Sequence, residues 1–140
     1  MILSILGTDT VFKHAMGELF FAAFCAFFGA VYEAFSFGVF SFFMIYAFSV
    51  PLAIAILLFV MYKREKTPPK RFIDLLHMTS VTAALGFIAT GVVEIYGSDN
   101  RLLWVYPFLG AGLFLAALIS YGINPSPQPD IKDLPNPPTP

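Results

Sequence analysis

The feature that most constrains this chain is a stretch without any charged side chain, which lies between Glu33 and Lys63. A membrane-spanning helix needs about 20 mostly apolar residues. The stretch is longer than one tilted span requires and shorter than two spans. It therefore predicts the end of one span, a tight turn at Ser36-Phe37-Gly38, and a second span.

The composition of the chain supports a lipid environment. Hydrophobic residues make up 58% of the 140 residues and charged residues 12%, whereas a soluble domain carries about 25% charged residues. A soluble chain this small buries only a limited share of its apolar surface. The net charge of −1 and the single short basic cluster give no indication of a nucleic-acid partner.

The hydropathy pattern predicts an all-α protein, a transmembrane bundle of four helices arranged as two helical hairpins. The expected spans cover residues 13–35, 39–62, 72–96 and 102–121 of a transmembrane domain over residues 1–123. Pro51 is expected to kink the second span, because proline lacks a backbone donor and its ring clashes with the preceding turn. Gly97-Ser98-Asp99-Asn100 is typical of a turn. The proline-rich tail 124–140 is expected to be disordered.

The distribution of lysine and arginine predicts the orientation, because cytoplasmic loops are enriched in both. With four spans, seven basic residues fall on one side and only Arg101 on the other. The seven are Lys13, Lys63, Arg64, Lys66, Lys70, Arg71 and Lys132. We therefore expect a multi-pass protein of the cell membrane with both termini in the cytoplasm. The N-terminus lacks the pattern of a cleaved signal peptide, so the first apolar stretch is expected to stay as a helix.

Helix periodicity divides the first span into two faces. One face carries phenylalanines, which we expect against lipid or between helices. The other carries small residues together with Glu18 and Glu33, and His14 lies just below it. The third span places His77, Ser80 and Glu94 on one broad face with small residues. The expected helix-packing face consists of Ala22, Cys25, Ala26, Gly29, Ala84 and Gly91.

Ionisable residues inside membrane spans are expensive and usually functional. If the first and third spans face each other, they form a track with His14, Glu18 and His77 at the cytoplasmic end and Glu33 and Glu94 at the outer end. These five residues are the candidate ion- or proton-binding residues. Simpler explanations remain open: Glu33 and Glu94 as solvated interfacial carboxylates, a His14–Glu18 pair on the helix surface, and His77 as an interfacial histidine.

The sequence favours no enzyme class. It has no glycine-rich phosphate loop, no nucleophile elbow and no HExxH motif, and we expect no catalytic residue, metal or cofactor. A haem between the two histidines is geometrically conceivable but interfacial. The single cysteine excludes an internal disulfide and is expected to be a small buried side chain. Lys63, Arg64, Lys66, Lys70 and Arg71 are candidates for contact with lipid headgroups.

One segment carries a resemblance. Val31 to Met44, followed by Tyr46, Ala47, Phe48 and Pro51, resembles a stretch in small four-helix membrane proteins of bacteria that have no established activity. The likeness covers about a fifth of the chain and implies a bacterial membrane origin. In those proteins histidines often stand near the positions of Phe35 and Phe37, so any role of such histidines would be lost here.

Two functions are left open by the sequence. The first is a cation- or proton-coupled transporter or channel-like protein that uses Glu18, Glu33 and Glu94. The second is a non-catalytic accessory or assembly subunit of a larger membrane complex. Because four short spans barely enclose a polar path, we expect a homodimer or a larger membrane-protein partner in addition to the lipid bilayer.

Overall fold

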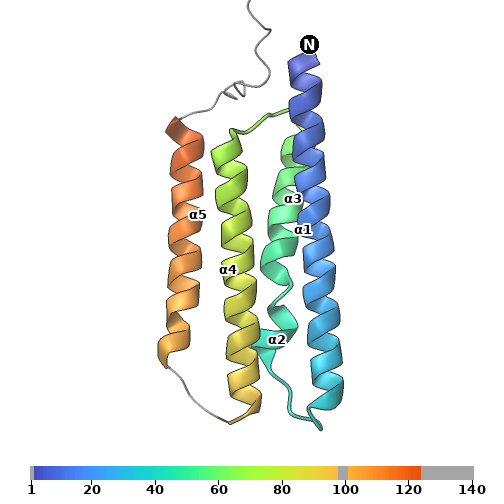
Figure 1. The fold of residues 1–140 in the computed structure, drawn as a ribbon, viewed down its shortest axis with the longest axis vertical. Coiled ribbons are helices and arrows are strands. Elements are labelled where there is room, and N and C mark those ends of the chain that lie inside the picture. The colour runs from blue at the N-terminus through green and yellow to red at the C-terminus, as the bar shows by residue number, and fades with distance from the viewer. Residues whose placement is uncertain (1, 98–100, 124–140) are drawn as a thin grey trace, which may run out of the picture.

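The computed structural model describes residues 2–97 and 101–123, and its side chains from residue 7 onward. The described chain is helical and contains no β-strand. The elements are α1 (Ile2–Phe35), α2 (Phe42–Tyr46), α3 (Ser49–Lys63), α4 (Lys70–Ile95), the 3₁₀ turn η1 (Arg101–Trp104) and α5 (Val105–Ile123). The prediction of an all-α bundle of two hairpins is confirmed (Figure 1).

Four helical segments are long and apolar enough to cross a membrane: Gly7–Phe35, Phe42–Lys63, Lys70–Ile95 and Arg101–Ile123. The first helix begins at Ile2, well before the expected start near Lys13. No proline interrupts this stretch, and Val11 belongs to the buried core with 1% exposure. The helix therefore begins before the expected span, and Val11 in this added part packs in the core. The tail 124–140 and most of the turn at 97–100 lie outside the described residues.

The first hairpin turns at Ser36, Phe37 and Gly38, as predicted. Phe37 and Gly38 both have positive φ angles, 54° and 88°, so the chain reverses through two left-handed residues. The Ser36 hydroxyl donates a hydrogen bond to the Glu33 carbonyl at 2.8 Å and thereby satisfies one of the last carbonyls of α1.

The second span is interrupted at Ala47 and Phe48, which separate α2 from α3. The interruption lies four residues before Pro51, whose missing N–H leaves the Ala47 carbonyl without its helical partner. The Ser49 hydroxyl donates to the Tyr46 carbonyl at 2.6 Å across the break. The expected kink is thus an interruption that divides one span into a short piece and a long piece.

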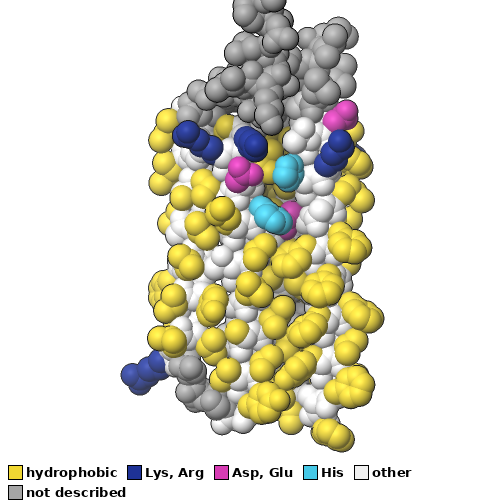
Figure 2. Space-filling view, viewed as in Figure 1, with side chains coloured by type: hydrophobic (Ala, Val, Ile, Leu, Met, Phe, Trp, Pro, Cys, Tyr) yellow, Lys and Arg dark blue, Asp and Glu magenta, His cyan; other side chains and the backbone are white. Residues whose placement is uncertain are grey.

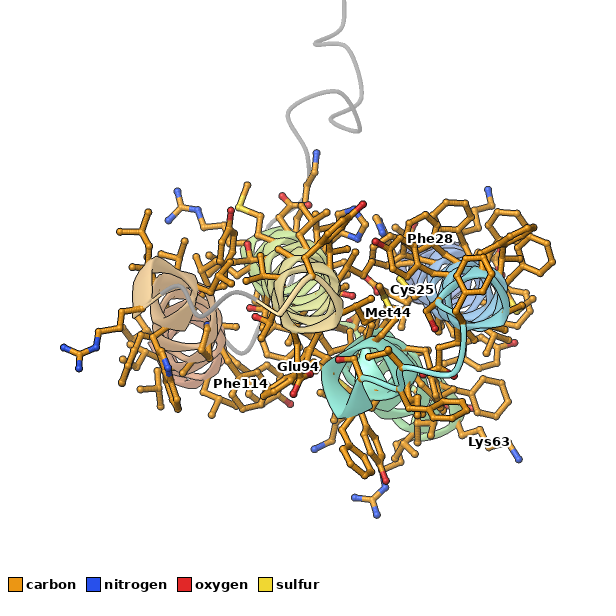
Figure 3. All side chains as sticks on the ribbon, turned by 90° about the horizontal axis from the view of Figure 1, so that it is seen from below. Cys25, Phe28, Met44, Lys63, Glu94 and Phe114 are labelled. Carbon is orange, nitrogen blue, oxygen red and sulfur yellow. The ribbon has the colours of Figure 1, made fainter. Side chains whose placement is uncertain are left out.

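The helices form an uneven bundle. In Figures 1 and 3, α1, α3 and α4 form a three-helix group, and α5 lies on the far side of α4. Gly86 permits the close approach of α5, because a Cβ there would lie 2.4 Å from the Cβ of Tyr106. The main hydrophobic cluster lies toward the end that holds the α3–α4 loop and includes Val11, Leu58, Leu76 and Ala117.

The basic side chains are distributed unevenly between the two ends of the bundle. Figure 2 shows most of the visible lysines and arginines gathered near one end, the end at which α1 starts and α5 finishes. This is the distribution on which the predicted orientation depends. Lys132 lies outside the described residues, and the cytoplasmic location of this end stays a prediction.

Candidate functional site

Glu18 belongs to a regular seam of buried residues on α1. The seam repeats at alternating steps of four and three residues, the spacing that keeps one narrow stripe against neighbouring helices. Its members are Val11, Ala15, Glu18, Ala22 and Cys25, each at most 4% exposed. Glu18 is the only ionisable carboxylate in this seam and is 3% exposed. The position of Glu18 in this repeat therefore places its carboxylate in the interior of the bundle.

Both carboxylate oxygens of Glu18 have partners on α4. Oε1 lies 2.6 Å from Nδ1 of His77, and Oε2 accepts a hydrogen bond from the Ser80 hydroxyl at 2.6 Å. His77 and Ser80 are three residues apart, so they lie on the same face of α4. Ser80 is fully buried. A buried carboxylate that would otherwise be costly is thus satisfied by two side chains of one neighbouring helix.

The Glu18–His77 contact holds one hydrogen between two groups that both bind protons. Either Nδ1–H of His77 donates to the carboxylate, or protonated Glu18 donates to the bare Nδ1. The two arrangements differ by the transfer of one proton over a 2.6 Å separation. The side chain of His77 is 59% exposed, whereas that of Glu18 is 3% exposed. The imidazole therefore connects an enclosed carboxylate with the outside of the bundle.

His77 lies seven residues after the first residue of α4, or about 10 Å along the helix axis. The pair is therefore located within the span but closer to the basic end than to the middle. Figure 2 shows the histidine side chains together with acidic ones on one face of the bundle, below the basic side chains. His14 and Asp74 are exposed. The hydrogen bonds of the Glu18 carboxylate go to His77 and Ser80 of α4 and not to His14 of its own helix.

The other two candidate carboxylates lie near the opposite end of the bundle. Glu94 is exposed, and its Oε2 accepts a hydrogen bond from Ser41 at 2.6 Å. Glu33 is half-buried, and its buried Oε1 has no hydrogen-bond partner among the described residues. The structure thus brings Glu18 and His77 together and places Glu33 and Glu94 elsewhere.

The short helix α2 separates the two ends of the expected track. Met44 is 1% exposed, and a Cβ added at Gly29 would lie 3.0 Å from its carbonyl oxygen. On the opposite side, a Cβ added at Gly91 would lie 3.0 Å from the Met44 Cβ. Figure 3 shows Met44 between α1 and α4, beside Cys25. Gly29 of α1 and Gly91 of α4 therefore leave the space in which Met44 of α2 packs.

The predicted packing face is largely buried. Five of its members have little or no exposure: Ala22, Cys25, Gly29, Ala84 and Gly91. Ala26 is exposed, because it follows Cys25 by one residue and is rotated about 100° away from the seam. Ala26 is thus not part of the packed face within this chain. Ser41 and Met44 were not among the sequence candidates, since an uncharged, phenylalanine-rich stretch gives no sign of which of its residues face inward.

The donor set does not resemble a metal centre. Among the described residues, no three or more of His, Cys, Asp and Glu are placed to hold a metal ion together. The basic candidates Lys63, Arg64, Lys66, Lys70 and Arg71 are all exposed. The arrangement around Glu18 can exchange a proton.

Comparison of the chain with protein-family models, curated proteins and solved structures found no match. Four apolar helices long enough to span a bilayer are compatible with a small multi-pass membrane protein. Any more specific function has to be argued from the Glu18 site itself.

Proposed function

We propose that this small membrane protein is a proton-coupled or proton-conducting transport protein in which Glu18 and His77 form the proton-binding pair. The observation that carries the proposal is the 2.6 Å contact between Glu18 Oε1 and His77 Nδ1 inside a membrane span. Ionisable groups at such depth are expensive and are typical of proton relays. Ser80 holds the second carboxylate oxygen and so fixes Glu18 toward the imidazole.

The chemistry of the pair follows from the two nitrogens of the imidazole. His77 takes up a proton at Nε2 from the exposed side while Nδ1–H passes its proton to Glu18, and the reverse sequence returns it. Each forward step moves one proton from the outside of the bundle to a carboxylate that is 3% exposed, and each reverse step moves one proton out. This step needs no metal or cofactor.

Passage to the other side requires a path around α2. Met44 fills the space between α1 and α4, and Ser41 is bonded to Glu94 on the far side of it. In several transporter folds, interrupted helices line the ion site and move during transport. The interruption at Ala47 and Phe48 gives α2 a place to move independently of α3. We propose that this movement connects Glu18 with the end that contains Glu94.

The test is proton flux into liposomes that contain the pure protein, driven by a pH gradient or a potassium diffusion potential. Glu18→Gln keeps the size and shape of the side chain but exchanges one acceptor oxygen for an NH2 donor and cannot ionise, and we expect it to abolish flux. His77→Gln is expected to reduce flux at least tenfold. Glu65→Gln is the matched control, since Glu65 is exposed in the loop between α3 and α4.

Two outcomes would overturn the transport proposal. One is wild-type flux no greater than that of empty liposomes, with the protein folded and inserted. The other is flux that Glu18→Gln leaves unchanged. Reconstitution in the presence of sodium or potassium gradients, with the same variants, distinguishes proton conduction from proton–cation exchange.

A second function is favoured by the surroundings of α5. Helix α5 packs against α4 and η1, and its outward side chains are largely exposed, including Phe108 at 73% and Leu115 at 59%. An accessory subunit would place this face against a partner in a membrane complex. A photo-crosslinking residue at Leu115 tests this function in native membranes: one discrete protein adduct supports it, and adducts with lipid alone contradict it.

A further inference from the structure

A shallow groove lies between α4 and α5 at the basic end of the bundle. It has a volume of about 330 Å³ and is lined by Arg71, Ala116, Ile119, Ser120 and Ile123. Arg71 comes from the first turn of α4 and the other four residues from the last two turns of α5. The groove does not involve the Glu18 site.

The lining of the groove combines two chemical characters. Arg71 supplies a cation, and Ser120 a hydroxyl that donates a hydrogen bond. The remaining lining residues are apolar and continue toward the middle of α5, where Leu115 is exposed. The described residues provide no ion-pair partner for Arg71, because the only ion pair among them joins His77 to Glu18. The groove thus has an unneutralised positive end and an apolar end.

The position of the positive end matches the depth of a phospholipid headgroup. Arg71 is the second residue of a membrane-spanning helix, and the start of a helix carries a partial positive charge that favours anions. Arginine presents a planar array of N–H donors that suits a phosphate. Lys70 adjoins it, and Lys63 at the end of α3 and Arg64 and Lys66 in the α3–α4 loop lie at the same end.

We infer that this groove is a binding site for one anionic phospholipid. Its phosphate is held by Arg71 and Ser120, and one acyl chain lies along Ile119 and Ala116 on the surface of α5. Charge complementarity selects an anionic lipid over a zwitterionic one, and the apolar lining selects a lipid over free phosphate. The inference does not depend on transport, since it rests on different residues and a different pair of helices.

The experiment measures lipid retention by native mass spectrometry of the full chain released from nanodiscs that contain phosphatidylglycerol and phosphatidylethanolamine in equal amounts. We expect the wild type to retain phosphatidylglycerol at least fivefold over phosphatidylethanolamine. Arg71→Gln is expected to remove this preference. Arg64→Gln is the matched control, because Arg64 is an exposed arginine at the same end that does not line the groove.

A second substitution tests the apolar part of the groove without changing the charge. Ile119→Trp fills the space beside Ser120 and is expected to lower retention at least threefold. Leu118→Trp is its control, since Leu118 is exposed on α5 but is absent from the lining. Glycerol phosphate added in tenfold excess should not displace the lipid.

Four results would overturn the site. Equal losses in Arg71→Gln and Arg64→Gln would mean diffuse attraction to the whole basic end. Unchanged retention in Arg71→Gln would exclude the headgroup contact, and unchanged retention in Ile119→Trp would exclude the acyl-chain contact. Displacement by glycerol phosphate would identify an anion site that does not need a lipid.

Discussion

Glu18 and Glu94 are glutamates on membrane-spanning helices, and each accepts a hydrogen bond from a serine at 2.6 Å, but their environments differ. Glu18 is 3% exposed and has a second partner in His77. Glu94 is exposed, and Ser41 is its side-chain hydrogen-bond partner among the described residues. Water and headgroups can therefore reach the Glu94 carboxylate, although Ser41 itself is buried, whereas the Glu18 carboxylate depends on its two partners. The same residue type thus joins two helices at one end and remains available to solvent at the other.

The first way to break this comparison is to remove each carboxylate in turn. Glu18→Ala leaves the buried Ser80 hydroxyl without a partner and opens a cavity, so we expect a loss of about 2.5 kcal/mol in the free energy of unfolding. Glu94→Ala also leaves a buried serine hydroxyl, that of Ser41, without its partner. Because it removes an exposed side chain and opens no interior cavity, we expect a smaller cost of about 1 kcal/mol. Unfolding in mixed micelles with increasing sodium dodecyl sulfate measures both. Equal losses would show that burial does not separate the two sites.

A second prediction concerns the packing of α2, which lies between the Glu18 and Glu94 sites. Gly91→Ala places a Cβ 3.0 Å from the Met44 Cβ and 3.1 Å from its backbone nitrogen, so α2 has to shift. Overpacking of this kind costs about 1 to 3 kcal/mol. At Gly17 on α1 nothing lies within 4 Å of an added Cβ, and Gly17→Ala should stabilise the helix by up to about 1 kcal/mol.

The same pair of alanine variants sharpens the functional side of the comparison. If α2 closes the route between Glu18 and Glu94, Gly91→Ala should change proton flux at least threefold and Gly17→Ala should not. The readout is flux per folded molecule in the liposome assay. A change of flux in Gly17→Ala of the same size would mean that the route does not pass α2.

The sequence predicted much of this architecture because a bilayer imposes simple rules on it. Hydropathy located four spans, and glycine and serine marked the turn at Ser36-Phe37-Gly38. Helix periodicity placed Glu18 on the small-residue face of one span, and His77 and Ser80 on one face of another. Those rules hold because each depends on residues close together in the chain. The carboxylate–imidazole contact itself depends on how α1 and α4 meet, which local spacing does not determine.

The position of α2 was not predictable for a related reason. Pro51 indicated a kink, but the insertion of Met44 between Gly29 and Gly91 depends on contacts among three separate spans. The expected track assumed that the first and third spans, α1 and α4, face each other. In the structure, Gly29 and Gly91 leave room for α2 between the two helices. The sequence alone is compatible with either arrangement. Which helix supplies a buried side chain such as Met44 is thus determined by tertiary packing.

The smallest expected difference is between the two serines. Ser80→Ala removes a hydrogen bond to a carboxylate that has no access to water, and we expect it to lower the free energy of unfolding by about 1 kcal/mol. Ser41→Ala removes a bond to the exposed Glu94 carboxylate and should cost less than about 0.5 kcal/mol. Because His77 still holds Glu18 in Ser80→Ala, proton flux should fall but persist. Complete loss of flux in Ser80→Ala with the fold intact would move the proton-binding role from the Glu18–His77 pair to the three side chains as one unit.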